Sequence, residues 1–346
     1  MTMVTLREIA ARCACSVATV SKALNDMPDI SPATASHIRS VAATMGYLPN
    51  AAARALKTNH SKIVGLLMFI RGESLWTHDY FSEIAASIQR VMSADGYDVV
   101  PIDTSAPSVM NNYVDYCRYR NYDGIIILSA GDIDAPMQAL VNSDIPLVTI
   151  DYAFHNRGAV LSDNAQGIHD LMHFVYEHGH RRIAYIYGEE TEVTNNRVAS
   201  FYACCDELGI AVDDAYMKRT LYRDPDASAK ATAELMALPV PPTCILYPDD
   251  YSYIGGWNEL IRMGLQVPQD VSCVGYDGIR LATLLRPKLT TLRQDADGIG
   301  ENAARMLIKA VEKRRSYLPK QVVLQGRLIP GETVLDISQQ RIAQLL

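Results

Sequence analysis

Long apolar runs and paired cysteines are both scarce in this 346-residue sequence. No stretch reaches 18 uncharged apolar residues, and the first residues lack a basic segment followed by an apolar one, so we expect neither a membrane span nor an export signal. The seven cysteines are an odd number and include no CxxC pair, which argues against a disulfide framework and a zinc site. We therefore predict a cytoplasmic protein with reduced thiols.

Sequence motifs of common enzymes are also absent. The sequence contains no GxSxG, HExxH or GxxxxGKS/T segment, the patterns of serine hydrolases, zinc proteases and phosphate-binding loops. The eight histidines are scattered, and the closest pair in sequence, His178 and His180, is expected to have a structural role at a helix end. We predict no catalytic residue, no metal and no cofactor, and hence no enzyme.

Basic residues are concentrated at one end of a chain whose net charge is −7. Residues 1–62 contain seven Lys and Arg against three acidic residues, a net charge of +4, so residues 63–346 carry −11. This division confines affinity for phosphates to the N-terminal segment. The first 62 residues are therefore the candidate nucleic-acid-binding part.

The basic segment has capping residues for three short helices. Thr5 and Ser16 can cap the first two, and Ser31 followed by Pro32 can begin a third that Gly46 ends. Two short helices joined by three or four residues are typical of a helix-turn-helix, whose second helix lies in the DNA major groove.

A short alanine-rich run follows the third expected helix. Asn50 can cap a helix that reaches Lys57, but a helix of this length is not stable alone in water. We expect it to fold only when packed on a second copy and on DNA, with Arg54 and Lys57 near phosphates and Leu56 inserted between base pairs of the minor groove. A flexible linker is the alternative.

From residue 63 onward, short apolar runs alternate with amphipathic segments, which predicts an α/β fold with parallel sheets covered on both faces. These 284 residues are too many for one sheet of ordinary size, so we predict two lobes. The expected strands span 63–69, 99–102, 124–128, 147–150, 183–187, 244–247 and 271–274. The expected helices span 80–95, 164–178, 195–209, 226–238, 251–263 and 297–313.

Acidic residues follow several of these expected strands. Asp151, Asp249, Asp250 and Asp277 come just after apolar runs, at the edge where α/β lobes bind ligands. Carboxylates at such places are also common helix caps and turn formers. For one acid we would prefer that structural role, but four of them favour a common ligand cleft.

Several spaced motifs resemble those of the lactose/galactose repressor (LacI/GalR) family. They include VTLREIA at 4–10, SVATVSKALN at 16–25, GYLPNAAARAL at 46–56, EHGHRRIA at 177–184, VPQDVSCVGYD at 267–277 and PKLTTLRQ at 287–294. The resemblance runs from about residue 3 to about residue 333. It implies a DNA-binding transcriptional regulator, a repressor whose affinity for its operator is controlled allosterically by a small effector.

The resemblance also implies which residues contact DNA. Val17, Ala18 and Lys22 match base-reading positions, and Ala53 and Leu56 match positions in the minor groove. Small apolar side chains suit thymine methyl groups, and lysine suits guanine O6 and N7. The rest of the expected DNA-binding set consists of Thr5, Leu6, Ser16, Thr19, Ser21, Asn25, Ser31, Thr34, Tyr47, Asn50, Arg54 and Lys57.

One turn residue departs from the family pattern. Ala14 stands where relatives often have glycine. If the backbone there is left-handed, alanine costs roughly 1 kcal/mol relative to glycine. The departure puts the turn geometry in question and leaves the helix-turn-helix assignment unchanged.

The domain organisation follows from the same resemblance. It implies a helix-turn-helix headpiece over 1–48, a hinge helix and linker over 49–61, and a periplasmic-binding-protein-like core over 62–346 that binds the effector and dimerises. The core would have an N-subdomain (about 62–161 and 293–324) and a C-subdomain (about 162–292 and 325–346), joined by three crossings of the chain.

Matching blocks place the effector pocket in this core. Carboxylates, one arginine and aromatic rings suit a sugar or sugar derivative. Within the family, a purine or a co-repressor protein is the alternative effector. The expected effector contacts are Phe69, Tyr80, Asp151, Arg197, Tyr222, Asp249 and Asp277.

One headpiece buries too little surface to hold DNA tightly, so we predict a homodimer on a pseudo-palindromic double-stranded operator. Only Leu335 to Leu346 follow the last family block, too few residues for the heptad helix that makes some relatives tetramers. A sugar-binding transport protein would share the core, but it would have an export signal and no headpiece.

Overall fold

The computed structural model describes residues 4–25, 27–48, 55, 60–68, 75–102, 112–129 and 134–338. The chain divides into two compact units, Met1–Ser61 and Lys62–Leu346, which we call the headpiece and the core. Within the described ranges, no helix is both long enough and apolar enough to cross a membrane.

The headpiece is a three-helix unit whose helices begin at the expected caps. Thr5 precedes α1 (Leu6–Arg12) and forms a capping box with Glu8, in which the Thr5 backbone N–H donates to the Glu8 carboxylate at 2.7 Å. Ser16 caps α2 (Val17–Leu24), and Ser31 caps α3 (Pro32–Thr44). The apolar faces of the three helices form one core of Ile9, Ala10, Val20, Ala23, Ala35, Ile38 and Ala42.

Two turns of the headpiece have left-handed backbone. Gly46, which follows α3, has φ +72°, a conformation that glycine adopts without strain. Ala14, between α1 and α2, has φ +51°. The condition on the Ala14 prediction is therefore met, and the cost of roughly 1 kcal/mol relative to glycine applies here.

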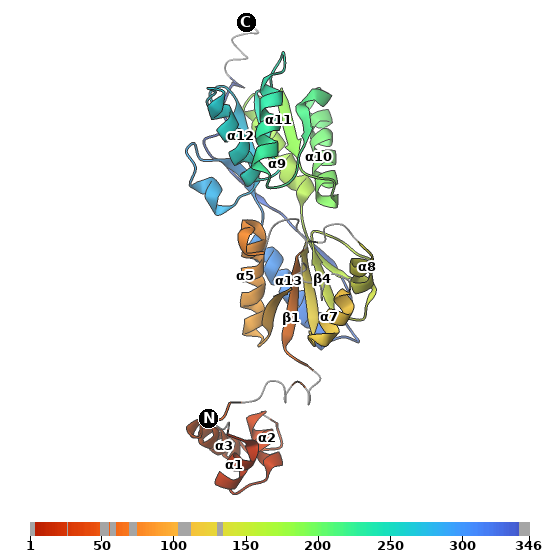
Figure 1. The fold of residues 1–346 in the computed structure, drawn as a ribbon, viewed down its shortest axis with the longest axis vertical. Coiled ribbons are helices and arrows are strands. Elements are labelled where there is room, and N and C mark those ends of the chain that lie inside the picture. Colours follow the sequence, from red (N-terminus) through yellow and green to blue (C-terminus); the bar gives the residue numbers. More distant parts are fainter. Residues whose placement is uncertain are drawn as a thin grey trace. The chain divides into compact units, whose positions relative to one another are not determined.

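The first lobe of the core is a six-stranded parallel sheet with helices on both faces (Figure 1). Its strand order is β11-β5-β4-β3-β1-β2. The strands are β1 (Ile63–Met68), β2 (Asp98–Ile102), β3 (Gly124–Ser129), β4 (Leu147–Ile150), β5 (Gly158–Ser162) and β11 (Gln321–Leu324). The helices are η1 (Leu75–Thr77), α5 (Asp79–Ala94), α7 (Tyr113–Tyr119), α8 (Ala135–Asn142) and α13 (Ala296–Glu312).

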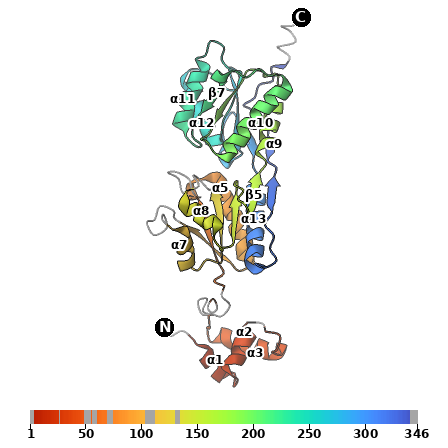
Figure 2. The same cartoon turned by 90° about the vertical axis from the view of Figure 1, so that its right-hand side faces the viewer.

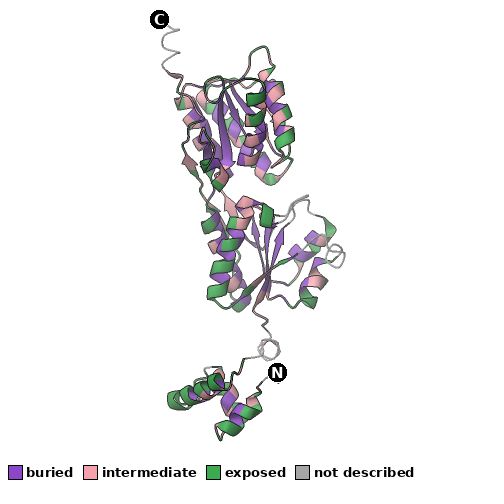
Figure 3. Ribbon diagram, turned by 60° about the vertical axis from the view of Figure 1, so that its left-hand side comes forward, coloured by how far each residue is buried: buried purple, intermediate pink, exposed green. Residues whose placement is uncertain are grey.

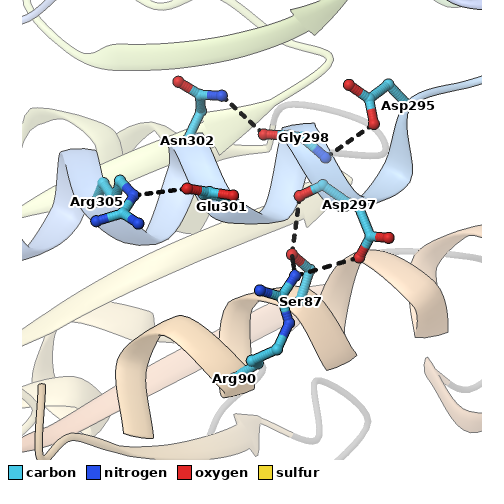
Figure 4. Close-up of polar contacts among 8 residues, drawn as sticks. All are labelled: Ser87, Arg90, Asp295, Asp297, Gly298, Glu301, Asn302 and Arg305. Atoms are coloured by element: carbon cyan, nitrogen blue, oxygen red, sulfur yellow. Dashed lines mark hydrogen bonds and ion pairs between the residues drawn. The ribbon is translucent and has the colours of Figure 1, made fainter. Parts of the chain in front are cut away.

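Helix α13, from late in the sequence, packs closely on α5 (Figure 4). The Ser87 hydroxyl donates to the Asp297 carbonyl at 2.8 Å, and the Arg90 guanidinium donates to Ser87 Oγ at 3.1 Å. A Cβ at Gly300 would come within 2.6 Å of the Ile84 carbonyl oxygen. Glycine at this position therefore permits the close approach of the two helices.

The second lobe repeats this architecture with its own sheet (Figure 2). The strand order is β12-β10-β9-β8-β6-β7, and only the pairing of β10 with β12 is antiparallel. The strands are β6 (Ile183–Tyr187), β7 (Met217–Arg219), β8 (Cys244–Leu246), β9 (Ser272–Asp277), β10 (Thr290–Arg293) and β12 (Arg327–Ile329). The helices are α9 (Asn164–Glu177), α10 (Glu192–Leu208), η2 (Asp214–Tyr216), α11 (Pro225–Met236), α12 (Asp250–Arg262) and η3 (Arg280–Thr283).

The chain passes between the two sheets three times, after β5, after β10 and after β11. Buried apolar residues lie on both faces of each sheet, and the covering helices expose their outer faces (Figure 3). The central strands are consequently buried on both sides, as parallel sheets require.

The predicted α/β fold with a helical headpiece is confirmed, and all seven expected strands are present with small shifts at their ends. The sequence did not predict β5, β7, β10, β11 or β12, nor helices α7 and α8. All of these elements are short. The strand β11 also alternates between exposed and half-buried residues, so it lacks the continuous apolar run that marks a central strand.

Candidate DNA interface and ligand site

Helix α2 presents the predicted base-reading residues on one exposed surface. Val17, Ala18 and Lys22 are all exposed, and Val17 is 41% exposed although it is apolar. Val20 and Ala23, on the opposite face, are buried in the headpiece core. The helix is therefore fixed by one face and offers the other to a partner.

Four hydroxyl groups of the expected DNA-binding set are ordered by local hydrogen bonds. Ser16 Oγ and Thr19 Oγ1 lie 2.8 Å apart, as do Ser31 Oγ and Thr34 Oγ1. Each serine also accepts a backbone N–H at the start of its helix. Capping thus places these hydroxyls at helix N-termini, where anions are favoured.

The exposed Lys22 ammonium is paired with Asp29. The Lys22 side chain lowers the pKa of the Asp29 carboxyl by hydrogen bonding to it. Any contact of Lys22 with a base would compete with this surface ion pair, which is weak because both side chains are about half exposed.

In the core, Arg197 of α10 is a buried cation that joins several elements. It is 4% exposed. Its Nε donates to Asn164 Oδ1 of α9 at 2.7 Å, and its Nη1 donates to the Pro248 carbonyl at 3.1 Å. The guanidinium lies 3.5 Å from the centroid of the Tyr276 ring. Its Nη2 donates to no described residue.

Asp277 ends β9 beside this arginine. Its backbone is left-handed, with φ +96°, and its Oδ1 accepts a hydrogen bond from Gln294 Nε2 at 2.7 Å. Burial raises the pKa of Asp277 to about 6, against the opposing effect of Arg197. Gln294 Oε1 is buried without a hydrogen-bond partner among the described residues.

Asp151 and Tyr80 form the corresponding group in the first lobe. Asp151 follows β4 with φ +62°, and its Oδ1 accepts from the Ser162 N–H at 3.2 Å. The Tyr80 hydroxyl lies 3.3 Å from Ser162 Oγ. Burial, followed by the charge of Asp151, raises the pKa of Tyr80 well above its ordinary value, and Asp277 and Arg197 are close enough to act on it as well.

Tyr222 follows β7 and lies at the edge of the same cluster. Its hydroxyl is 2.9 Å from Thr194 Oγ1, and its ring centroid is 5.9 Å from the Arg197 guanidinium. A Cβ at Gly188 would come within 2.4 Å of the Tyr222 ring. Glycine therefore lets the ring lie flat against the backbone.

Asp249 and Asp250 have structural partners within the second lobe. Asp249 caps α12, and its two oxygens accept from Ser252 N–H, Ser252 hydroxyl and Arg223 N–H. Asp250 accepts from the Ile279 N–H at 2.9 Å and the Thr291 hydroxyl at 2.7 Å. Both acids thus have the helix-cap and turn roles that are the structural alternative to ligand binding.

Arg223 connects the two lobes directly. Its Nη2 donates to the Thr77 carbonyl at 2.9 Å, and its Nη1 lies 3.7 Å from Asp79 Oδ2. Its guanidinium lies 3.8 Å from the centroid of the Tyr251 ring. Because Asp249 accepts from the Arg223 backbone, the cap of α12 positions this bridging side chain.

Comparisons with known proteins cover both units. Residues 5–50 match the family model of bacterial regulatory proteins, lacI family, and residues 172–334 match that of the periplasmic binding protein-like domain. The chain is 28% identical to the HTH-type transcriptional repressor PurR of Escherichia coli O139:H28 (strain E24377A / ETEC), over 96% of this chain and 98% of that protein. The chain belongs to the LacI family. It is a DNA-binding transcriptional regulator.

Solved structures share the fold of this LacI-family chain. The lac repressor dimer bound to operator and the anti-inducer ONPF gives a TM-score of 0.81 at 22% identity, with 96% of this chain and 100% of that chain covered. The complex of the transcriptional regulator CelR with cellobiose gives 0.73 at 23% identity, with 95% and 99% covered.

The structure brings Tyr80, Asp151, Arg197, Tyr222 and Asp277 of this LacI-family core into one electrostatically connected cluster. Phe69 and the hinge residues Asn50, Ala53, Arg54, Leu56 and Lys57 lie outside the described residues. Tyr47 and Leu6 are half-buried against the headpiece core.

Sequence reasoning missed several residues of the ligand cluster, namely Asn164, Arg223, Tyr276 and Gln294. Tyr276 and Gln294 lie inside the family motifs and Asn164 begins an expected helix, but no local pattern shows that they meet Arg197 or Asp277. Arg223 has left-handed backbone, φ +53°, and no sequence signal marked its contact with the other lobe.

The two histidines expected to be structural make structural contacts. His180 is buried, with its two ring nitrogens 3.0 Å from Thr243 Oγ1 and 3.1 Å from the Leu335 carbonyl oxygen. Burial lowers the pKa of His180 to about 4. The His178 ring lies 2.7 Å from the Phe174 carbonyl oxygen.

Proposed function

We propose that this LacI-family regulator binds a polyhydroxylated ligand, a sugar or sugar derivative, at the cluster around Arg197 and Asp277. The observation that carries the proposal is two unsatisfied acceptors, one on half-buried Asp277 and one on buried Gln294, next to the buried Arg197 cation. Asp277 Oδ2 accepts from no described residue, and Gln294 Oε1 has no partner there either. Hydroxyl groups of a ligand would satisfy both acceptors.

The aromatic residues and Arg197 complete the proposed contacts. Tyr222 offers a ring face for the apolar side of a sugar, and Arg197 Nη2 offers a donor. Tyr80 and Asp151 supply the first-lobe side of the site. Phe69 stays in the proposed set on the sequence argument alone. Asp249 contributes by holding Arg223, so its direct contact with an effector remains a prediction.

On the DNA side, we propose a homodimer that reads a pseudo-palindromic operator. Val17, Ala18 and Lys22 would face the bases, and the hydroxyls ordered at the starts of α2 and α3 would face phosphates. Leu56 and Ala53 would enter the minor groove through the hinge helix. The proposed site of action is cytoplasmic, with no catalytic step.

We propose that the Arg223 bridge links ligand binding to DNA binding. A ligand that favours one arrangement of the lobes would strengthen or break the contacts of Arg223 with Thr77 and Asp79. The arrangement of the lobes would in turn set the spacing of the two hinge helices in the dimer. Ligand binding and operator binding are then coupled by the same free energy in both directions.

The ligand proposal is tested by thermal shift over sugars, sugar phosphates and purines, followed by calorimetric titration of the best ligand. We expect a sugar to bind, and Asp277→Asn to weaken it more than tenfold. Asp206→Asn, which changes an exposed acid on α10, is the matched control and should bind normally. A response to purines alone would overturn the sugar assignment, and equal binding by Asp277→Asn would remove Asp277 from the site.

The DNA proposal is tested with operators selected from random double-stranded DNA. Leu56→Ala should reduce affinity for every selected sequence, because the minor-groove wedge is lost. Lys22→Met should reduce affinity and relax the preference at one base pair of each half-site. Unchanged affinity in Leu56→Ala would contradict the hinge assignment.

A further inference from the structure

Two histidines on the second lobe face each other one helical turn apart. His169 and His173 lie on α9, and their rings stack with centroids 4.0 Å apart and planes at 25°. Side chains four residues apart share one face of a helix. This pair lies further apart in the sequence than His178 and His180 do.

A third ligating side chain comes from the neighbouring helix. Glu207 of α10 places Oε1 3.5 Å from His173 Nε2. One ring nitrogen of His169, one ring nitrogen of His173 and one Glu207 oxygen all lie within 4.8 Å of one another. The three atoms therefore surround a common point between the two helices.

Each of the two histidines also has one ring nitrogen that is buried without a hydrogen bond among the described residues. These nitrogens are His169 Nδ1 and His173 Nε2. The nearest carboxylate oxygen to His169 Nδ1 is Asp170 Oδ1, at 3.7 Å, beyond hydrogen-bonding distance. A buried polar atom without a hydrogen bond costs free energy, so two such atoms at one place indicate that another group binds there.

Ion pairing of protonated histidines explains the site less well than a shared cation does. Two imidazolium rings stacked at 4.0 Å would repel each other. Neutral rings would leave both nitrogens without partners. A metal ion bound to both nitrogens and to the Glu207 carboxylate satisfies all three groups at once.

We propose that His169, His173 and Glu207 bind a divalent first-row transition metal ion, with zinc as the best match. Two imidazole nitrogens and one carboxylate are a common zinc set, and a water molecule would complete the tetrahedron. Zinc bonds of about 2.0–2.2 Å place neighbouring ligand atoms roughly 3.3–3.5 Å apart. The His173–Glu207 separation of 3.5 Å already fits.

The metal would tie together two helices that Arg197 already joins. Arg197 of α10 bonds to Asn164 of α9, and His173 and Glu207 lie nine and ten residues further along the same helices. The proposed ion would therefore join α9 and α10 at a second place along the two helices, away from the cluster around Arg197. Metal binding is expected to stabilise the second lobe.

The test uses the full-length, reduced protein without a polyhistidine tag, titrated with Zn²⁺ by calorimetry and with Co²⁺ by visible absorption. We expect one Zn²⁺ per chain and a tetrahedral Co²⁺ spectrum. His173→Gln and Glu207→Gln should each weaken Zn²⁺ binding more than tenfold. His155→Gln, which changes an exposed loop histidine, is the control and should bind as the wild type does.

A second readout separates this site from the thiols of the headpiece. Zn²⁺ should raise the Tm of the wild type and of Cys13→Ser/Cys15→Ser, but not that of His169→Gln/His173→Gln. Binding that persists in Glu207→Gln and His173→Gln, or that is lost in the cysteine variant, would overturn the proposal. The Glu207 side chain is 58% exposed, so Glu207→Gln should fold normally. A loss of Zn²⁺ binding in this variant would therefore come from the lost ligand and not from misfolding.

Discussion

The headpiece and the core place their functional side chains in opposite environments. In the headpiece, Val17, Ala18 and Lys22 are exposed, and the polar side-chain contacts described above join residues three to seven positions apart. In the core, Arg197 is buried and Asp277 is half-buried, and their partners come from distant parts of the chain. The proposed DNA-contacting groups are therefore expected to contribute little to folding stability, whereas the proposed ligand-contacting groups also hold parts of the core together.

The largest effect expected from this contrast concerns the two cations. Arg197→Met should lower the free energy of unfolding of the core by about 3 kcal/mol, because Asn164 and Pro248 lose a donor and the nearby carboxylates lose their counter-charge. Lys22→Met should change the free energy of unfolding of the headpiece by less than about 0.5 kcal/mol. Urea denaturation of both variants measures the difference. Equal losses would contradict the contrast.

Replacing Asp277 should change the stability of the core in the opposite direction, because folding partly removes its charge from water. Its folded pKa of about 6 lies above its ordinary value of 3.8, so the group's favourable contribution is complete below about pH 4 and is lost as the pH rises through 6. At pH 7.5, Asp277→Asn should raise the free energy of unfolding by about 2 kcal/mol.

The stability gain of Asp277→Asn should disappear below pH 4, where the wild-type carboxyl is protonated in both states. Denaturation curves of both proteins between about pH 2.8 and about pH 7.5, roughly one unit or more beyond the two pKa values, check the sign. A gain that does not depend on pH would show that charge burial is not its cause. Higher stability with weaker ligand binding would mark Asp277 as a residue kept for function.

The smallest effect concerns the headpiece turn. Ala14→Gly should stabilise the headpiece by about 1 kcal/mol, because Ala14 has φ +51°. Ala11→Gly, inside α1, is the matched control and should destabilise it by about 1 kcal/mol. Hydrogen exchange of the α1 and α2 amides in the full chain measures both changes. A loss of protection in Ala14→Gly would show that the turn does not strain alanine.

The sequence predicts local features well and long-range contacts poorly. The caps Thr5, Ser16 and Ser31 and the central strands follow from patterns within a few residues. The meeting of Arg197 with Asn164, 33 residues away, depends on how α9 and α10 pack. For the same reason, no pattern could distinguish Asp249 from Asp277.

Both acids follow strands, and only the structure distinguishes their surroundings. Asp249 is in extended backbone with both oxygens engaged, whereas Asp277 is left-handed with one oxygen engaged. The approach of His169 and His173 to Glu207 likewise depends on how α9 packs on α10. Side-chain roles at strand ends are therefore settled by tertiary packing, after secondary structure is known.

The three passages of the chain between the sheets impose an order of events during synthesis on the ribosome. The first lobe is begun earlier, yet its core needs Ala303 and Leu307 of α13 and its sheet needs β11. Both are made only after most of the second lobe has emerged. A nascent chain that ends before residue 296 would leave the face of α5 uncovered, so the lobe that starts first must wait for the end of translation to be completed.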